Sequence, residues 1–335
     1  MKINFKLWIS IIFSLFFVVL VLYNIDFEKT SKALKTANYI YLPVAVLLSI
    51  VTNILRTYRW KFIISPIKKI STNSLFSGVA IGYMANNLLP ARLGEFIRAY
   101  IMGKKEDISK SSTLATILVE RIFDGLALLF FLVIIALVFS LPLWIKEAGI
   151  GAAAFFIFLS AFLILLMIKK NTGIRLTKKL ITIFSARLAE KVGDLLNNFL
   201  SGLIIVNHKR NIFWAFTFSI IVWLSEASTY YIISMSFNID LPVYVALLTV
   251  VIVNIGILIP SAPGYIGAFE FFCISALAIF SIEKSIALSF AIVLHSVLFI
   301  PITLIGIYYF WKENMNLSDI ANVAKLPQAS VESKV

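Results

Sequence analysis

Uninterrupted apolar stretches of about twenty residues constrain this chain more than any other feature of its sequence. A helix that crosses about 30 Å of hydrocarbon at about 1.5 Å per residue needs about twenty apolar residues. The mean hydropathy of the whole chain, +0.95, agrees with such stretches. We therefore expect an all-α integral membrane protein, a polytopic helical bundle with about six full spans. The spans are predicted at residues 7–23, 39–55, 111–140, 148–168, 212–237 and 286–311.

The spans suggest a simple domain organisation. We expect a single transmembrane domain over residues 1–312, followed by a flexible cytoplasmic tail over 313–335. The first span follows Lys2 and Lys6 as in a signal sequence, but no small-residue cleavage site comes after it, so we interpret it as an uncleaved helix. Cys273 is the one cysteine of the chain, so it is expected to pack as a small buried hydrophobe.

The basic residues predict the orientation in the membrane. One set of loops, together with the termini, holds 24 of the 30 Lys and Arg residues, and the other set holds 5. Loops rich in Lys and Arg face the cytoplasm, so we expect both termini inside and the protein in the inner (cytoplasmic) cell membrane. Basic loops beside anionic lipid headgroups account for the net charge of +13, and no nucleic-acid partner is expected.

Two further segments, 74–103 and 242–280, are apolar but interrupted by proline and glycine. The predicted loops before and after each segment lie on one side of the membrane, so each segment must enter and return. We expect broken or re-entrant helix pairs that enter from opposite faces. The alternative is a pair of short complete helices in each segment.

The two broken segments resemble each other, which suggests an inverted repeat. Both place Asn before Pro, and then Gly, Phe and Glu within a few residues. The matching residues are Asn86, Pro90, Gly94, Glu95 and Phe96 in the first segment and Asn254, Pro263, Gly267, Phe269 and Glu270 in the second. Interrupted segments that enter from opposite faces are typical of transporters with a binding site near the middle of the bilayer.

The interruptions have a chemical consequence. Helix breaks are expected at Pro90, Gly94, Pro260, Pro263, Gly264 and Gly267. A proline leaves backbone groups that lipid cannot satisfy, so this backbone must line protein or water. The half-helix after each break offers free amides to an anion, and Arg92 and Arg98 add guanidinium groups suited to a phosphate. Alternatively, these arginines only extend to the cytoplasmic headgroups while Asn86 and Asn87 cap the break.

A second group of charges lies in the stretch "LVERIFDGLALLFF", residues 118–131. Glu120 and Asp124 are four residues apart and share a helix face, while Arg121 and Asp124 are three apart and can pair. Charged side chains at membrane depth face the bundle interior or a wet cavity, where they often serve function. We expect Arg92 or Arg98 as a further partner, because the triplet is acidic by one. The alternative is internal neutralisation that only fixes helix packing.

Other polar residues give weaker signals. Glu226 is the one acidic residue in its span and is a candidate ion or proton site, although Ser225, Ser228 and Thr229 beside it favour an ordinary helix contact equally well. His295 is expected to pack or to bond a carbonyl. No metal, nucleotide or other cofactor motif is present. Residues 169–210 are predicted to form a basic amphipathic helix on the inner leaflet.

Three motifs in order carry a family resemblance: "NNLLPARLGEFIRAY", then "VERIFD", then "PSAPGYIGAFE". Over about residues 5–312 the chain resembles the lysylphosphatidylglycerol synthase transmembrane-region family of flippase-like membrane proteins, but without the soluble synthase domain of the fused members. The resemblance implies lipid movement between leaflets. It also implies these signature residues: Asn87, Pro90, Arg92, Gly94, Glu95, Arg98, Glu120, Arg121, Asp124, Pro263, Gly264, Gly267 and Glu270.

Together these patterns predict a lipid flippase. An anionic phospholipid or lipid-linked headgroup would bind Asn87, Arg92, Glu95, Arg98, Glu120, Arg121, Asp124 and Glu270 while its acyl chains stay in the bilayer. The expected partners are membrane lipids with anionic headgroups and a separate lipid-modifying enzyme. Alternatives are an integral membrane enzyme that uses Glu95, Glu120 or Asp124 on a lipid, a small-molecule exporter, or a membrane scaffold. The longest predicted loop, about forty residues, is too short for a catalytic domain, so we expect a transporter rather than an enzyme.

Overall fold

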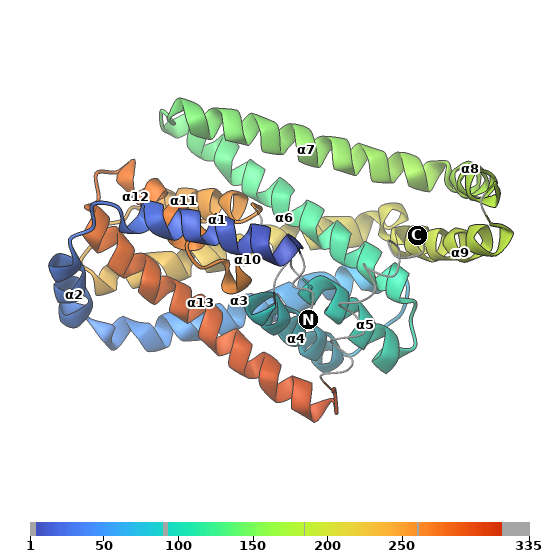
Figure 1. Ribbon diagram of the computed structural model, residues 1–335, viewed down its shortest axis with the longest axis horizontal. Coiled ribbons are helices and arrows are strands. Elements are labelled where there is room, and N and C mark those ends of the chain that lie inside the picture. Colours follow the sequence, from blue (N-terminus) through green and yellow to red (C-terminus); the bar gives the residue numbers. More distant parts are fainter. Residues whose placement is uncertain (1–4, 90–92, 184, 260, 317–335) are drawn as a thin grey trace.

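The computed structural model describes residues 5–89, 93–183, 185–259 and 261–316. The described part of the chain is helical and contains no strand, which confirms the expected all-α class (Figure 1). Its helices are α1 (Phe5–Leu22), α2 (Phe27–Thr36), α3 (Leu42–Ile64), α4 (Thr72–Leu88), α5 (Gly94–Glu106), α6 (Lys110–Val138), α7 (Leu143–Ile168), α8 (Lys170–Thr182), α9 (Ala186–Gly202), α10 (Lys209–Ser236), α11 (Val243–Gly256), α12 (Ala268–Ala278) and α13 (Lys284–Lys312). Short 3₁₀ turns precede α3, α10 and α12: η1 (Tyr39–Tyr41), η2 (Ile204–Asn207) and η3 (Pro263–Tyr265).

Five of these helices are long and apolar enough to cross a membrane: α3 with η1, α6, α7, α10 and α13. The predicted first span becomes α1, which turns by 87° into α2. The predicted end of the second span, at residue 55, is wrong. The span predicted at 39–55 continues to Ile64, so Arg56 and Arg59 lie inside a helix rather than in a basic loop. Both side chains are buried, because carboxylates of other helices neutralise them.

Contacts between the ends of helices define two ends of the bundle. At one end, the Asn38 end, the backbone of Asn38 donates to Ser236 O, and the ring of Phe139 packs against Phe280. At the other, the Asn211 end, Asn211 Nδ2 donates to Phe62 O, and Lys105 pairs with Glu313. In Figure 1 the Asn38 end is on the left and the Asn211 end is on the right.

Both broken segments enter and return, as predicted. The pair α4–α5 begins and ends at the Asn211 end, and α11–α12 begins and ends at the Asn38 end (Figure 1). At 1.5 Å per residue even α4, the longest of the four with 17 residues, spans only about 26 Å, and α12 with 11 residues spans about 17 Å. Because each of them is shorter than about 30 Å, their lengths favour re-entrant pairs over the alternative of short complete helices.

The order and direction of the helices form an inverted repeat. In the first half, α3 runs toward the Asn211 end, α4–α5 enter and return there, and α6 runs back (Figure 1). In the second half, α10 runs toward the Asn38 end, α11–α12 enter and return there, and α13 runs back. The two halves pack through α3 and α10, where Thr52 Oγ1 and Ser225 Oγ are 2.8 Å apart.

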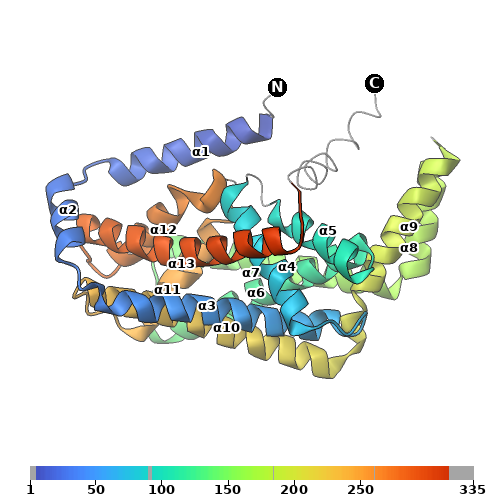
Figure 2. The ribbon, with the colours of Figure 1, turned by 90° about the horizontal axis from the view of Figure 1, so that it is seen from below.

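The basic segment 169–210 differs from its prediction. It forms not one amphipathic helix but two, α8 and α9, which pack side by side as a hairpin. Lys178 lies against Gly193, where a Cβ would be 1.9 Å from Lys178 Cε. In Figure 2 this hairpin stands across the direction of the long helices at the Asn211 end. The chain turns near residue 183, between two short amphipathic stretches that were predicted from the sequence to form one continuous helix.

Candidate functional site

The two helix breaks meet in the interior of the bundle. The turn η3 of the second break packs against α4, and a Cβ on Gly264, whose φ is +71°, would lie 3.3 Å from the backbone oxygen of Asn87. Asn87 Nδ2 in turn donates to Thr303 Oγ1 of α13 at 2.8 Å. The contact requires a glycine, because a side chain at Gly264 would also be strained by the positive φ.

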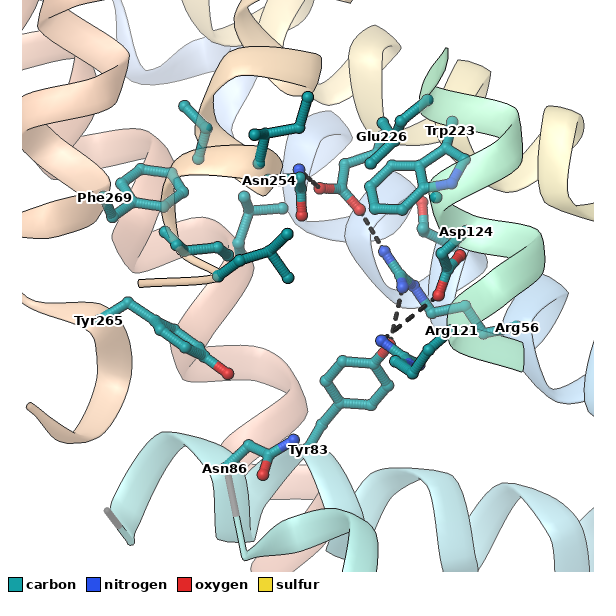
Figure 3. A pocket seen from close by; sticks show the side chains of 18 of the residues that line it. Arg56, Tyr83, Asn86, Arg121, Asp124, Trp223, Glu226, Asn254, Tyr265 and Phe269 are labelled. Atoms are coloured by element: carbon teal, nitrogen blue, oxygen red, sulfur yellow. Dashed lines mark hydrogen bonds and ion pairs between the residues drawn. The ribbon is translucent and has the colours of Figure 1, made fainter. Parts of the chain in front are cut away.

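A cavity of about 350 Å³ lies beside this meeting point. Polar side chains from both halves point into it, and in Figure 3 Tyr265 of η3 lies across the cavity from Arg56 and Arg121. The polar lining consists of Ser49, Thr52, Asn53, Arg56, Tyr83, Asn86, Asn87, Glu95, Arg121, Asp124, Glu226, Asn254, Tyr265 and His295. The remaining walls are apolar. Two of them, Phe155 of α7 and Leu258 after α11, are 57% and 47% exposed, so the cavity is open at these apolar walls and not enclosed.

Arg56 and Glu226 form an ion pair between α3 and α10 at one wall. Arg56 Nη1 also donates to the Tyr83 hydroxyl at 2.7 Å, and its guanidinium lies 5.1 Å from the centre of a Trp223 ring. Asn254 Nδ2 donates to the second Glu226 oxygen at 3.4 Å. Glu226, which stands alone in its own span, is therefore neutralised by a residue that the sequence placed in a loop.

A second layer of buried charge lies behind the cavity. Glu120 has no exposed side-chain area and accepts from Arg59 at 3.0 Å and from Arg98 at 2.9 Å. Arg59 also pairs with Asp124. Arg98 lies 3.5 Å from the centre of a Trp60 ring and does not line the cavity. Arg98 is therefore a partner of the acidic triplet, as expected, but it acts on Glu120 rather than facing a ligand.

Arg121 connects this layer to the cavity. Its Nη2 is 2.6 Å from Glu120 Oε1, and its Nη1 is 3.3 Å from Asp124 Oδ2, the pair that the spacing of three predicts. Its Nε is 3.9 Å from Glu95 Oε1, in the first turn of α5. With a side chain 30% exposed, Arg121 is the most accessible of the four described arginines in this network. We call the Glu95–Arg121 contact the first joint.

An equivalent contact, the second joint, holds α12 to α13. His295 Nδ1 is 2.6 Å from Glu270 Oε1 in the first turn of α12. The other Glu270 oxygen accepts the Gly267 amide at 2.7 Å, and the His295 ring stacks on Phe269 with centroids 4.3 Å apart. In the first break, Asn86 Oδ1 accepts the Gly94 amide at 2.8 Å. One amide at each half-helix start is therefore bound by the chain itself.

The predicted site residues fall into four groups. Asn87, Glu95, Arg121, Asp124 and Glu226 line the cavity, and Glu270 touches it through His295. Arg98 and Glu120 support it from behind. Gly94, Pro263, Gly264 and Gly267 lie at the breaks. Pro90, Arg92 and Pro260 lie outside the described residues.

Sequence reasoning missed Arg56, Arg59, Tyr83 and Trp223. One signal was present: Ser49, Asn53 and Arg56 recur at intervals of three and four, which places them on one helix face. A polar face that runs on past an apolar stretch indicates that the helix continues. In the described ranges no group of three or more His, Cys, Asp or Glu residues could hold a metal ion.

Comparisons with known proteins agree with this architecture. A UPF0104 membrane protein of Methanothermobacter thermautotrophicus is 24% identical over 294 residues, which cover 83% of this chain and 87% of that protein. The UPF0104 membrane protein MJ1078 of Methanocaldococcus jannaschii is 27% identical over 235 residues, 69% of this chain and 95% of that protein. The family described as the lysylphosphatidylglycerol synthase TM region matches residues 7–306. The chain is therefore a multi-pass integral membrane protein and belongs to this family.

Proposed function

We propose that this protein moves an anionic phospholipid or a lipid-linked headgroup between the two leaflets, with the headgroup passing through the cavity between the two breaks. The observation that carries the proposal is a polar, charged cavity at the meeting point of two re-entrant helix pairs that enter from opposite ends. Such a cavity gives a charged headgroup a route that the hydrocarbon does not offer.

The walls of the cavity support a lipid rather than a soluble substrate. Phe155 and Leu258 combine a position on the cavity with exposure at the outer surface. Acyl chains can therefore remain in the bilayer while the headgroup enters beside α7. Arg121 supplies an accessible guanidinium for a phosphate, and Asn86, whose side-chain oxygen accepts the Gly94 amide, lines the same cavity and offers its amide nitrogen as a donor.

The test is translocation of headgroup-labelled phosphatidylglycerol in proteoliposomes that contain an Ala152→Trp variant. Ala152 of α7 lines the cavity, so the indole should fill it and reduce translocation at least tenfold. Ala154→Trp is the matched control, because Ala154 lies on the same helix but is exposed and does not line the cavity. Thermal stability is measured for both variants.

Equal translocation by the two variants at normal stability would contradict the proposal. Mass spectrometry of the recovered lipid separates transport from catalysis. We expect the lipid to be chemically unchanged, whereas an integral membrane enzyme would return a modified headgroup. In that case the cavity would be a catalytic site, and the transport proposal would be wrong.

A further inference from the structure

The two joints occupy the same place in the two halves. The helices α6 and α13 both contain 29 residues, and Arg121 and His295 each lie eleven residues after the first residue of their helix. Each contacts a glutamate in the first turn of the preceding half-helix, Glu95 or Glu270. The scaffold repeats, but one half carries a guanidinium, which is always charged, and the other an imidazole, which can bind or release a proton.

His295 contacts residues that pack against the second break, which itself packs against the first. Its ring contacts Phe269 in the first turn of α12 and lies edge-on to Phe299, with centroids 5.8 Å apart. Phe299 touches the second break, since a Cβ on Gly264 would be 2.7 Å from its ring. His295 also lines the cavity, and its side chain is 13% exposed. A proton on His295 would therefore change the charge both in the cavity and beside the contact between the breaks.

The groups that face this part of α13 come from every element around it. Tyr265 of η3, Tyr83 of α4, Arg56 of α3 and Glu226 of α10 line the cavity together with His295. Glu270 of α12 contacts His295, Cys273 follows Glu270 by three residues on the same helix, and Tyr230 of α10 packs against Phe290 of α13. Lys29 of α2 is remote, because it pairs with Glu283, twelve residues before His295 and thus about 18 Å away along the helix. Glu270 is the charged group in direct contact.

The charge balance indicates what protonation would do. Among the described residues, the cavity and its supporting layer contain four arginines and five carboxylates: Arg56, Arg59, Arg98 and Arg121, against Glu95, Glu120, Asp124, Glu226 and Glu270. With His295 neutral the formal charge of these described groups is −1, which opposes entry of an anion. A proton on the imidazole brings the formal charge to zero.

We propose that the His295–Glu270 pair is a proton-binding site, and that one proton binds His295 together with the anionic group of the substrate in the adjacent cavity. The proton comes from water, adds to the imidazole and compensates one negative charge of the substrate. This inference rests on the proposed transport function and extends it by naming a second ligand. Because coupling is reciprocal, anion binding must also favour protonation of His295.

The chain contains only two histidines, which permits a direct test. His208 is exposed at the start of α10, so a His208→Gln protein leaves His295 as the single imidazole. Its titration is followed by NMR of ring-labelled histidine in the full-length protein. Saturating dihexanoyl phosphatidylglycerol should move the titration midpoint upward by about one pH unit. An unchanged midpoint would overturn the proposal.

Binding of the same probe gives the complementary measurement. We expect its Kd to be about tenfold lower at pH 5.5 than at pH 8. Gln keeps a hydrogen bond to Glu270, so His295→Gln should fold but bind with little pH dependence, and His295→Arg, which copies the first joint, should bind tightly at both pH values. If the unmodified protein bound the probe with equal affinity at pH 5.5 and pH 8, the proton site would be disproved, while the proposed transport function would stand. If the unmodified protein did not bind the probe at pH 5.5 or at pH 8, the proposed transport function would be contradicted as well.

Discussion

The two re-entrant pairs differ in the side chains that support them. The first joint is supported by a layer of buried charge, in which Glu120 holds Arg59 and Arg98. The second joint is supported by aromatic rings, Phe269 and Phe299, and by a single carboxylate, Glu270. An inverted repeat can therefore preserve geometry while different side chains support its two halves. The first half is fixed by permanent charges, and the second can change its charge.

The largest effect is expected when the charged layer is broken. Glu120→Ala leaves two buried guanidinium groups without their shared carboxylate, and loss of one member of a buried ion pair destabilises proteins by about 3–5 kcal/mol. Glu270→Ala should destabilise less, because Glu270 has one side-chain partner, His295, whereas Glu120 holds three arginines. The free energy of unfolding of both variants, measured in the same detergent, checks the order. An equal loss would show that the two supports are equivalent.

The second prediction concerns the close approach of α4 and α5. A Cβ on Gly94 would lie 2.0 Å from the Gly82 backbone oxygen, so Gly94→Ala must push the two helices apart and destabilise by about 1–3 kcal/mol. Gly151→Ala in α7 is the control, because nothing lies within 4 Å of its Cβ position. Thermal unfolding distinguishes them. Similar midpoints would mean that the first pair is looser than its backbone contact indicates.

A third change makes the two joints alike. Arg121→His gives the first half a titratable side chain at the position that corresponds to His295. We expect transport to become several-fold more dependent on acid pH, because Glu95 then loses its permanent cationic partner among the described residues and Asp124 retains only Arg59. The measurement is the pH profile of lipid translocation. A profile that stays parallel to that of the unmodified protein would argue against a charge role for Arg121.

The smallest effect is expected at the surface. Lys29 and Glu283 pair at 2.9 Å between α2 and the start of α13, but their side chains are 58% and 47% exposed. Solvent screens such pairs, so Lys29→Ala should leave the unfolding temperature within experimental error. A clear decrease would indicate that the Asn38 end is held by its exposed charges and not only by apolar packing.

Much of the fold followed from apolar length and proline placement, since only a helix can satisfy its backbone in lipid. The position of Arg56 and Arg59 did not, because their partners lie far away in the chain and a basic cluster beside an apolar stretch resembles a loop. The triplet of Glu120, Arg121 and Asp124 was visible from its spacing. The pairing of Glu270 with His295 was not, because it depends on how α12 packs against α13.

The arginines of α3 also bear on how the protein enters the membrane. Arg59 is separated from its carboxylate partners by 61 and 65 residues, and Arg56 from Glu226 by 170. At a synthesis rate of about 5–20 residues per second, the carboxylates of α6 are synthesised about 3–12 s after Arg59, and Glu226 of α10 follows later still. Arg56 and Arg59 lie in the C-terminal half of α3, so each opposes insertion by less than the about 2.5–3.5 kcal/mol of an arginine at a helix centre. Biogenesis should therefore hold α3 at the insertion machinery until α6 emerges, so that the helices enter lipid as a neutralised group.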